Sequence, residues 1–359
     1  MPSSPQSAAE AATRRIAAGR LQSFTSAVLG AVGLPAQDAD ICARLMVRAD
    51  LFGADGHGVF RLPQYVRRIQ GGAVNACPRV RIEREAAGMA LVDGDNGMGH
   101  VVMSFAAKTA IEKAKTAGAA WVGVNRSNHA GPASLYAAMP LEEDMIGLYL
   151  AVGNANHMAP WGGVDLLLST NPIAVAVPGS EGPIVLDMAT SVAAYGKVKT
   201  AGQRGETLPE GWMIDHQGRP LTDPKRAEGG LLVPIGGYKG YGLALVIGLL
   251  AGSLNAAAMG SETIDFNADD TTPTNTGHAI VAISIAAFGE VSDFKRRVDK
   301  LVREIRRSKR MPGVDRVWLP GEQSRAKLEE RSQLGIPIPE ALRAGLDKLA
   351  AELKIKALE

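Results

Sequence analysis

One short segment, residues 55–63 (DGHGVFRLP), carries two side chains that together could do chemistry on a small acid. His57 and Arg61 are four residues apart, so they would project from one face if a helix begins here. An imidazole, with an ordinary pKa of about 6.5, exchanges protons at neutral pH, and a guanidinium holds a carboxylate through two parallel hydrogen bonds. Reduction of a 2-oxo acid uses both groups: the imidazole gives the oxo oxygen its proton as hydride reaches C2, and the guanidinium holds the carboxylate. Taken alone, the spacing also fits a histidine that ends a turn and an arginine in a surface ion pair.

Other segments could bring a ligand close to the backbone. His129 lies in NRSNHAGPASLYAAM, after a predicted strand and before a predicted helix of small residues, where free N–H groups can receive a phosphate or a substrate oxygen. A capping or core histidine fits that pattern equally well. The turns IVLDMATS and GGYKGYG, the latter with Lys239, also suit a close approach, although glycines mark ordinary turns more often.

Several kinds of site are not indicated. None of the six histidines forms a pair at metal-ligand spacing, so we predict no metal site. Cys42 and Cys77 lack CxxC spacing and are expected to be reduced and buried. No GxGxxG follows a predicted strand, so the usual doubly wound dinucleotide fold is unsupported.

The composition favours work on small molecules. The chain has 359 residues, 46% of them hydrophobic, enough for two closely packed domains. A net charge of +2 is too small for the protein as a whole to attract nucleic acid or an anionic membrane electrostatically. The first residues lack the apolar core of a signal peptide, so we expect a cytoplasmic protein. Residues 241–259 approach the length of a membrane span, but their glycines, Ser253 and Asn255 indicate a buried core helix.

The order of elements predicts an α/β (α+β) fold. Residues 12–54 show helical spacing, whereas residues 145–189 contain several β-rich runs without strict alternation with helices, which favours a mixed or mainly antiparallel sheet. We divide the chain into a mainly helical part (1–120) that carries His57, a central sheet part (121–290) and a C-terminal helical part (291–359) that packs back on the first. The basic run 303–310 fits a helix C-terminus that faces water.

Taken in order, the motifs resemble those of a known family. The chain is similar to the malate and lactate dehydrogenases that are unrelated to the Rossmann enzymes, together with ureidoglycolate and sulfolactate dehydrogenases, diketogulonate reductase and piperideine- or pyrroline-carboxylate reductases. The resemblance runs from about residue 48 to 339 through DGHGVFRLPQY, DGDNGMGH, NRSNHAGP, MAPWGG, STNPIAVAVP, IVLDMATS, GQRGETLPEGW, IGGYKGYGLAL, WLPGEQ and LGIPIP.

The resemblance implies a homodimer in which NAD or NADP lies on a mainly antiparallel sheet, in a fold that is not the Rossmann fold. By motif it implies that His57 is the proton donor and acceptor, that Arg61 binds the substrate carboxylate, and that Thr170 touches substrate. His129 is implied near the reacting atoms, and Asp187 as a residue that orients a catalytic group. The implied cofactor contacts are His129, Ala130, Gly131, Pro132, Ala133, Asp187, Met188, Ala189, Lys239, Gly240, Pro320, Gly321 and Glu322.

One departure from the family keeps alternatives open. The family usually has Ser immediately before this histidine, whereas this chain has Gly56. A water could occupy the space of the missing hydroxyl at a modest cost of about 0–2 kcal/mol. The main hypothesis is a dehydrogenase that interconverts small 2-oxo and 2-hydroxy acids. The alternatives are a cyclic imine reductase, because VFR resembles the piperideine branch, and a catalytically impaired member that still binds cofactor.

Overall fold

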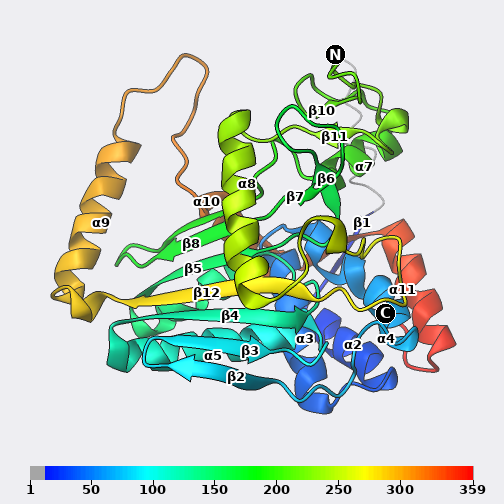
Figure 1. The fold of residues 1–359 in the computed structure, drawn as a ribbon, viewed down its shortest axis with the longest axis horizontal. Coiled ribbons are helices and arrows are strands. Elements are labelled where there is room, and N and C mark those ends of the chain that lie inside the picture. The colour runs from blue at the N-terminus through cyan, green and yellow to red at the C-terminus, as the bar shows by residue number, and fades with distance from the viewer. Residues whose placement is uncertain (1–12, 359) are drawn as a thin grey trace.

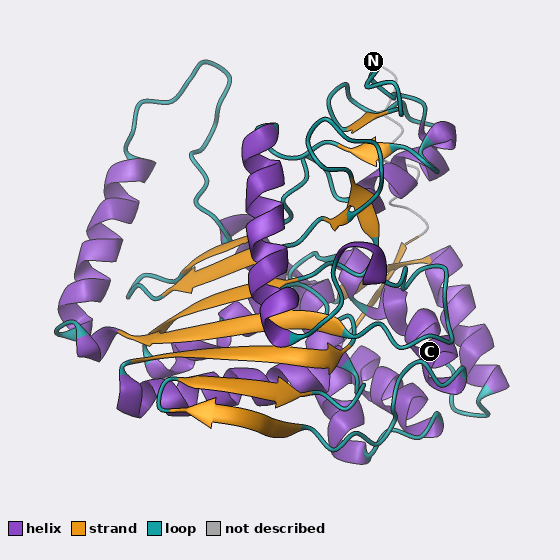
Figure 2. Ribbon diagram, in the orientation of Figure 1, coloured by secondary structure: helices purple, strands orange, loops and turns teal. Residues whose placement is uncertain are grey.

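The computed structural model describes residues 13–358. A seven-stranded sheet in the order β2-β3-β4-β12-β5-β8-β9 forms its centre (Figures 1 and 2). The strands are β1 (Thr13–Ile16), β2 (Arg81–Ala86), β3 (Met89–Asp93), β4 (Ala119–Ser127), β5 (Met145–Ala151), β6 (Asn156–Met158), β7 (Leu168–Ser169), β8 (Ile173–Val177), β9 (Ile184–Met188), β10 (Met213–Ile214), β11 (Leu231–Leu232), β12 (Thr276–Ser284) and β13 (Ile336–Pro339). The helices are α2 (Ala18–Ala31), α3 (Ala36–Leu51), α4 (Leu62–Gln70), α5 (Gly99–Ala117), α6 (Ser134–Ala137), α7 (Tyr195–Arg204), α8 (Tyr238–Ala251), α9 (Val291–Arg306), α10 (Glu322–Leu334) and α11 (Glu340–Glu352).

The pairing of the sheet confirms the predicted architecture. Only β3 and β4 run parallel, and every other neighbouring pair in the seven-stranded sheet is antiparallel. The two central strands, β4 and β12, carry almost continuous buried apolar runs because helices pack on both faces: α5 on one and α8 on the other (Figure 2). The prediction of a mixed, mainly antiparallel sheet is therefore confirmed.

The two ends of the chain pack together, as expected. β1 pairs antiparallel with β13, and α11 contacts α4. One shared core contains Leu21 and Leu29 of α2 together with Leu346 and Leu349 of α11. The expectation of helix throughout residues 12–54 was wrong at Thr13–Ile16, because the partner strand that makes this segment extended lies more than 300 residues away. Ala12 lies outside the described residues.

Helix α8 is less buried than predicted. Its small residues, such as Ala244 and Gly248, face the protein, whereas Val246 and Leu249 are 51% and 47% exposed. Small side chains allow the helix to approach the sheet closely, while Val246 and Leu249 lie on its outer face. No helix among residues 13–358 is long and apolar enough to cross a membrane. Cys42 is buried and free as expected, but Cys77 is free and exposed, because it lies in the loop before β2.

Candidate active site

The segment that carries His57 and Arg61 is not one continuous helix. It forms two 3-10 turns, Asp55–His57 and Val59–Arg61, and α4 begins only at Leu62. The expectation that the pair shares a helical face was therefore wrong. Arg61 instead folds back, and its Nε donates a hydrogen bond to the backbone oxygen of Gly56 (2.9 Å). Besides burial, the guanidinium charge lowers the pKa of the neighbouring His57, so the two side chains still belong to one cluster.

A buried carboxyl group from α3 explains the break between these turns. Oδ2 of Asp50 accepts the backbone N–H of Val59 at 2.9 Å, and burial raises the pKa of this carboxyl to about 8. A Cβ added at Gly58 would lie 1.9 Å from Oδ1 of Asp50, so only glycine fits there. Arg331 of α10 closes the turn from the other side, because its guanidinium pairs with the side chain of Asp55 and the backbone oxygen of Asp50.

Gly58 and Gly56 form a matched pair for testing this packing. Gly58→Ala is expected to lower the free energy of unfolding by about 1–3 kcal/mol, the usual cost of overpacking, and to reduce activity by displacing His57. Gly56→Ala has open space at its Cβ and is expected to leave stability nearly unchanged. Urea unfolding of both variants checks this, and equal stability of the two would contradict the packing argument.

Three side chains form a row of polar contacts that ends at His57. Nδ1 of His57 lies 3.3 Å from Nε2 of His129, and Nδ1 of His129 lies 2.5 Å from the hydroxyl of Tyr65. The two imidazole rings are stacked, with centroids 5.4 Å apart, and Phe266 stacks on the other side of His129. Both nitrogens of His129 are thereby engaged, so Nε2 of His57 is the ring nitrogen of this pair left for a substrate.

Burial sets the protonation state of these rings. Desolvation, followed by the nearby Arg61 guanidinium, lowers the pKa of His57 to about 4. Desolvation also lowers the pKa of His129 well below its ordinary value. Both rings are therefore neutral at pH 7, and either nitrogen of each can carry the single proton. A row of neutral imidazoles that ends in a tyrosine hydroxyl can pass a proton along its length by exchanging tautomers.

Buried neutral histidines elsewhere in the core make stability depend on pH. Burial lowers the pKa of His100 to about 3 and that of His278 to about 4. In the unfolded chain both take up a proton near pH 6.5, so their contribution to stability is complete above that pH and is lost as the pH falls toward 4, by about 1.4 kcal/mol per pH unit for each. His278→Gln should reduce this slope in urea unfolding between pH 6.5 and 5, whereas His216→Gln, at an exposed position, should not. Identical slopes in the two variants would rule the explanation out.

Arg61 is held firmly but keeps part of its fork open. Its Nη1 donates to Oε1 of Gln64 (2.8 Å) and to Oδ1 of Asn267 (3.0 Å). Within the part of the chain that the structure describes, Nη2 has no hydrogen-bond partner, so its two N–H groups remain for a carboxylate. The loop that supplies Asn267 is anchored by the buried Arg68, whose Nη2 donates to the backbone oxygen of Thr272 (2.9 Å).

The residues that sequence reasoning missed are Tyr65, Gln64, Phe266 and Asn267. Tyr65 had a usable signal, since it lies four residues after Arg61 in the predicted helix. Phe266 and Asn267 had none, because they come from an irregular loop that meets His129 and Arg61 only in the folded chain. His57 and His129, which the sequence analysis had named, lie together in this cluster.

The predicted cofactor turns gather around β9. Oδ2 of Asp187 accepts the N–H of Ser134 at 2.8 Å, which joins β9 to the segment that follows His129. The backbone N–H of Thr190 donates to the oxygen of Thr170 (3.0 Å), and the oxygen of Thr190 accepts the N–H of Ile235 (2.9 Å). Ile235 leads into the turn that carries Lys239. Val185 donates its N–H to the oxygen of Pro320 at 3.1 Å. Segments more than 100 residues apart in the sequence thus surround one strand.

Their geometry suits a dinucleotide held mainly by backbone groups. Gly131 and Gly321 both have positive φ, +79° and +87°, and a Cβ at Gly321 would lie 2.9 Å from the oxygen of Val185. Lys239 is exposed at the start of α8. The side chains of Ala130, Pro132 and Ala133 carry no polar atom, so only backbone groups there could form hydrogen bonds with a ligand. No group of three or more His, Cys, Asp or Glu side chains suited to a metal occurs among the described residues.

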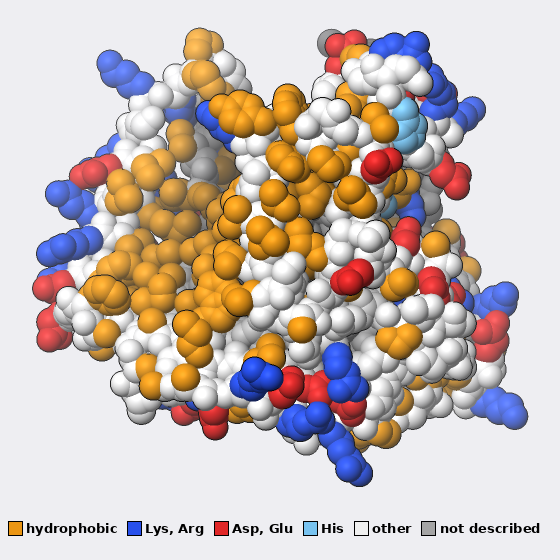
Figure 3. All heavy atoms as spheres, viewed as in Figure 1, with side chains coloured by type: hydrophobic (Ala, Val, Ile, Leu, Met, Phe, Trp, Pro, Cys, Tyr) orange, Lys and Arg blue, Asp and Glu red, His pale blue; other side chains and the backbone are white. Residues whose placement is uncertain are grey.

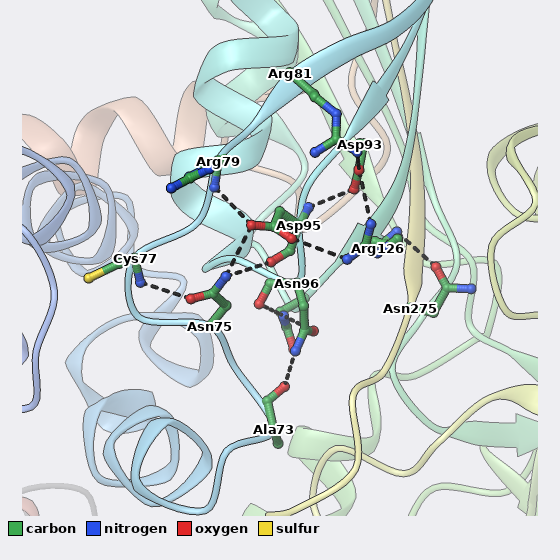
Figure 4. A network of polar contacts seen from close by, with 11 residues as sticks. Ala73, Asn75, Cys77, Arg79, Arg81, Asp93, Asp95, Asn96, Arg126 and Asn275 are labelled. Atoms are coloured by element: carbon green, nitrogen blue, oxygen red, sulfur yellow. Dashed lines mark hydrogen bonds and ion pairs between the residues drawn. The ribbon is translucent and has the colours of Figure 1, made fainter.

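A polar network fixes the strand end that leads to His129. The carboxylate of Asp93, at the end of β3, is buried and pairs with Arg81 and Arg126 (Figure 4). Arg126 also reaches Asp95, and its backbone oxygen accepts the N–H of Asn96. Three residues of this network, Asp95, Asn96 and Arg126, have positive φ. The network therefore holds the ends of β3 and β4 in a tight conformation just before His129.

Comparison with known proteins gives this arrangement its class. The model of the malate/L-lactate dehydrogenase family matches residues 16–347. Malate dehydrogenase from Pyrococcus abyssi is 40% identical over 353 residues, 96% of each chain. Sulfolactate dehydrogenase from Methanocaldococcus jannaschii superposes with a TM-score of 0.90 at 35% identity, over 96% of this chain and 100% of the other. Δ1-piperideine-2-carboxylate reductase from Pseudomonas syringae gives a TM-score of 0.83 at 28% identity, over 94% and 100%.

The chain therefore belongs to the malate/L-lactate dehydrogenase family. It is an oxidoreductase that acts on CH–OH groups.

Proposed function

We propose that this enzyme interconverts a small 2-oxo acid and the corresponding 2-hydroxy acid with NAD or NADP as hydride carrier. The observation that supports this most strongly is the row from Tyr65 through His129 to His57, which ends beside the half-open guanidinium of Arg61. A proton-exchanging group next to a carboxylate binder is what a 2-hydroxy acid requires. Relatives named as NAD⁺- and NADP⁺-dependent dehydrogenases, at 32% and 33% identity, support the cofactor.

The chain's own residues supply the acid–base half of the reaction. A nicotinamide cofactor bound at the β9 turns would supply or accept the hydride at C2 of the substrate. Nε2 of His57 takes the hydroxyl proton during oxidation and returns it to the oxo group during reduction. His57 then shares the proton with His129 through their 3.3 Å contact, and the hydroxyl of Tyr65 fixes the tautomer of His129.

Substrate orientation falls to Arg61 and its supports. The N–H groups of Nη2 hold the substrate C1 carboxylate, while the contacts to Gln64 and Asn267 keep the guanidinium plane in place. Thr170, which directly follows β7 and whose backbone oxygen accepts the N–H of Thr190, supplies a hydroxyl on the β9 side of the site. In this proposal Asp187 positions the segment after His129 through Ser134 rather than exchanging a proton itself.

Turnover assays test the reaction and its alternatives together. Purified enzyme is mixed with NADH or NADPH, and loss of absorbance is followed with pyruvate, oxaloacetate, sulfopyruvate, pyrroline-2-carboxylate and piperideine-2-carboxylate. Turnover of oxo acids supports the proposal, whereas turnover of imines alone would replace it with imine reduction, which the piperideine-carboxylate reductase neighbour favours as the second candidate. If no substrate turns over, Gly56→Ser becomes decisive, because its Cβ has open space and activity gained there would identify an impaired enzyme.

We also propose that the protein is a homodimer, with its second copy on the outer face of α8. Hydrophobic side chains gather over α8 and over the sheet between α8 and α9 (Figure 3). Val246, Leu249 and Leu254 are each about half exposed or more. Large apolar side chains that gather on one exposed face are typical of a protein–protein interface. The cytoplasmic location and the division of the chain at residues 120 and 290 stay predictions.

Charge placed on this face should break the dimer. The double variant Val246→Lys/Leu249→Lys is expected to sediment as a monomer, because the free energy needed to desolvate two ammonium groups exceeds the stabilisation from the apolar contact. Leu334→Lys, an exposed position at the end of α10, which packs on α3 and β13, serves as the control and should not change the mass. Sedimentation equilibrium measures both, and a wild-type monomer would contradict the proposal.

A further inference from the structure

The basic run 303–310, which begins in the last turn of α9, meets the proposed cofactor site at Glu322 through Arg306. This carboxyl group is only 5% exposed, and three arginines surround it. Arg306 contacts one oxygen, Arg316 lies 3.3 Å from the other, and Arg325 lies 4.0 Å away. Three guanidiniums thus share a single carboxylate, which leaves an excess of positive charge beside the Pro320–Val185 contact.

Glu322 itself cannot receive a ribose. A nicotinamide site that selects NAD commonly uses an acidic side chain to accept the 2′-hydroxyl. Here Oε1 of Glu322 is engaged by Arg306, and Oε2 accepts the backbone N–H of Leu319 (3.0 Å) as well as the Arg316 contact. Asp187, the other carboxyl of the site, is directed through Ser134 toward the His129 segment, at the reacting end.

The cationic surface continues beyond Glu322. Arg306 also lines an open hollow on this side of the molecule, and the other lining residues are Arg307, Ser308, Lys309, Arg310, Met311, Val314 and Asp315. The guanidinium of Arg316 lies over the exposed ring of Trp318, 4.1 Å from its centroid. A stacked guanidinium keeps its N–H edges directed outward, which is the arrangement that binds phosphate oxygens.

We propose that Arg316 and Arg325, beside Glu322, bind the 2′-phosphate of NADP(H), so that this enzyme prefers the phosphorylated cofactor. The assignment rests on the proposed function, because it requires the adenosine end of a nicotinamide cofactor to lie along the Pro320–Glu322 turn. It goes further by naming the cofactor and the residues that select it. Arg306 keeps Glu322 paired and so serves the fold rather than the ligand.

Binding of nucleotides tests the assignment without any substrate. Wild-type enzyme is titrated calorimetrically with NADPH and NADH, and with 2′,5′-ADP, 3′,5′-ADP and 5′-AMP as fragments. NADPH is expected to bind about 10–100-fold more tightly than NADH, the worth of a charge-assisted hydrogen bond, and 2′,5′-ADP should exceed both other fragments. 3′,5′-ADP has the same two phosphates in a different position, so it separates recognition from general attraction of charge.

Variants at the two arginines localise the effect. Arg316→Ala and Arg325→Ala should each lose most of the preference for NADPH while binding NADH as before. Arg84→Ala, an exposed arginine on β2 at the other edge of the sheet, should behave like wild type. Circular dichroism confirms that each variant is folded.

Each remaining outcome has a definite meaning. Equal binding of NADPH and NADH by wild type overturns the assignment but leaves the proposed function intact. So does an equal loss of both cofactors in the arginine variants, which would place these side chains on a phosphate that the two cofactors share. Failure of wild type to bind either cofactor contradicts the proposed function itself.

Discussion

His57→Asn is expected to lower kcat by about 10²–10⁴-fold in both directions, the usual contribution of a positioned acid–base group. Asparagine preserves polarity and approximate size but cannot exchange a proton. Binding of NADPH or NADH should stay unchanged, because the proposed cofactor contacts lie around β9 rather than at this ring. Steady-state kinetics with the oxo acid that turns over, together with a cofactor titration, measures the two quantities separately. A kcat within a factor of two of wild type would remove His57 from the reaction.

The pH profile gives an independent check on the same residue. Since burial lowers the pKa of His57 to about 4, this ring is already neutral and ready to accept a proton well below pH 6.5. We expect kcat/KM for hydroxy-acid oxidation to persist on the acid side until the pH approaches that value. Tyr65→Phe keeps the ring but loses the 2.5 Å contact to His129, so it should lower kcat less than His57→Asn does. A larger loss in Tyr65→Phe would make the tyrosine the principal acid.

Arg61→Ala is expected to lower kcat/KM by about 10–150-fold, which corresponds to the 1.5–3 kcal/mol of a hydrogen bond to a charged group. Most of the loss should appear in KM, because the carboxylate is bound in the ground state as well as in the transition state. Arg61→Lys keeps the charge but not the fork that Gln64 and Asn267 hold, so it should recover only part of the loss.

A neighbouring arginine supplies the control for this experiment. Arg67 lies on α4, directly after the turn that carries Arg61, is exposed, and pairs with Asp270. Arg67→Ala removes an equal charge from the region without touching the substrate site, so it should leave kcat/KM close to wild type. If Arg61→Ala and Arg67→Ala behave alike, the effect comes from the general electrostatic field, and Arg61 does not bind the carboxylate.

The sequence predicted the class of sheet but not the local path at His57. The periodicity of hydrophobic residues, together with the turn residues at each end, identifies β4, β12 and α5, because each of these elements is long enough to show its pattern clearly. The turn at His57 depends on Asp50 and on the missing Cβ of Gly58, and the strand Thr13–Ile16 depends on β13. Such features are set by partners distant in the chain, which no local pattern reports.

Those residues of the proposed site that lie in short motifs could be named from the sequence, whereas those that only the fold brings near could not. His57, Arg61 and His129 lie in short distinctive segments, and the structure brings them together. Asn267 and Phe266 reach the site because Arg68 anchors their loop, an interaction of a buried guanidinium with backbone oxygens. Backbone acceptors leave no trace in a sequence, so this wall of the site could be found only from coordinates.

The contact of Arg331 with Asp55 also sets an order of events during synthesis. These two residues are 276 positions apart, and the turn that carries His57 is closed only when both are present. At about 5–20 residues per second, a ribosome needs roughly 15–55 s to make the intervening chain. The turn that carries His57 therefore lacks its closing contact for most of the time that the polypeptide is being made. A nascent chain or a fragment that stops before α10 can form the sheet's strands and yet lack a fixed His57.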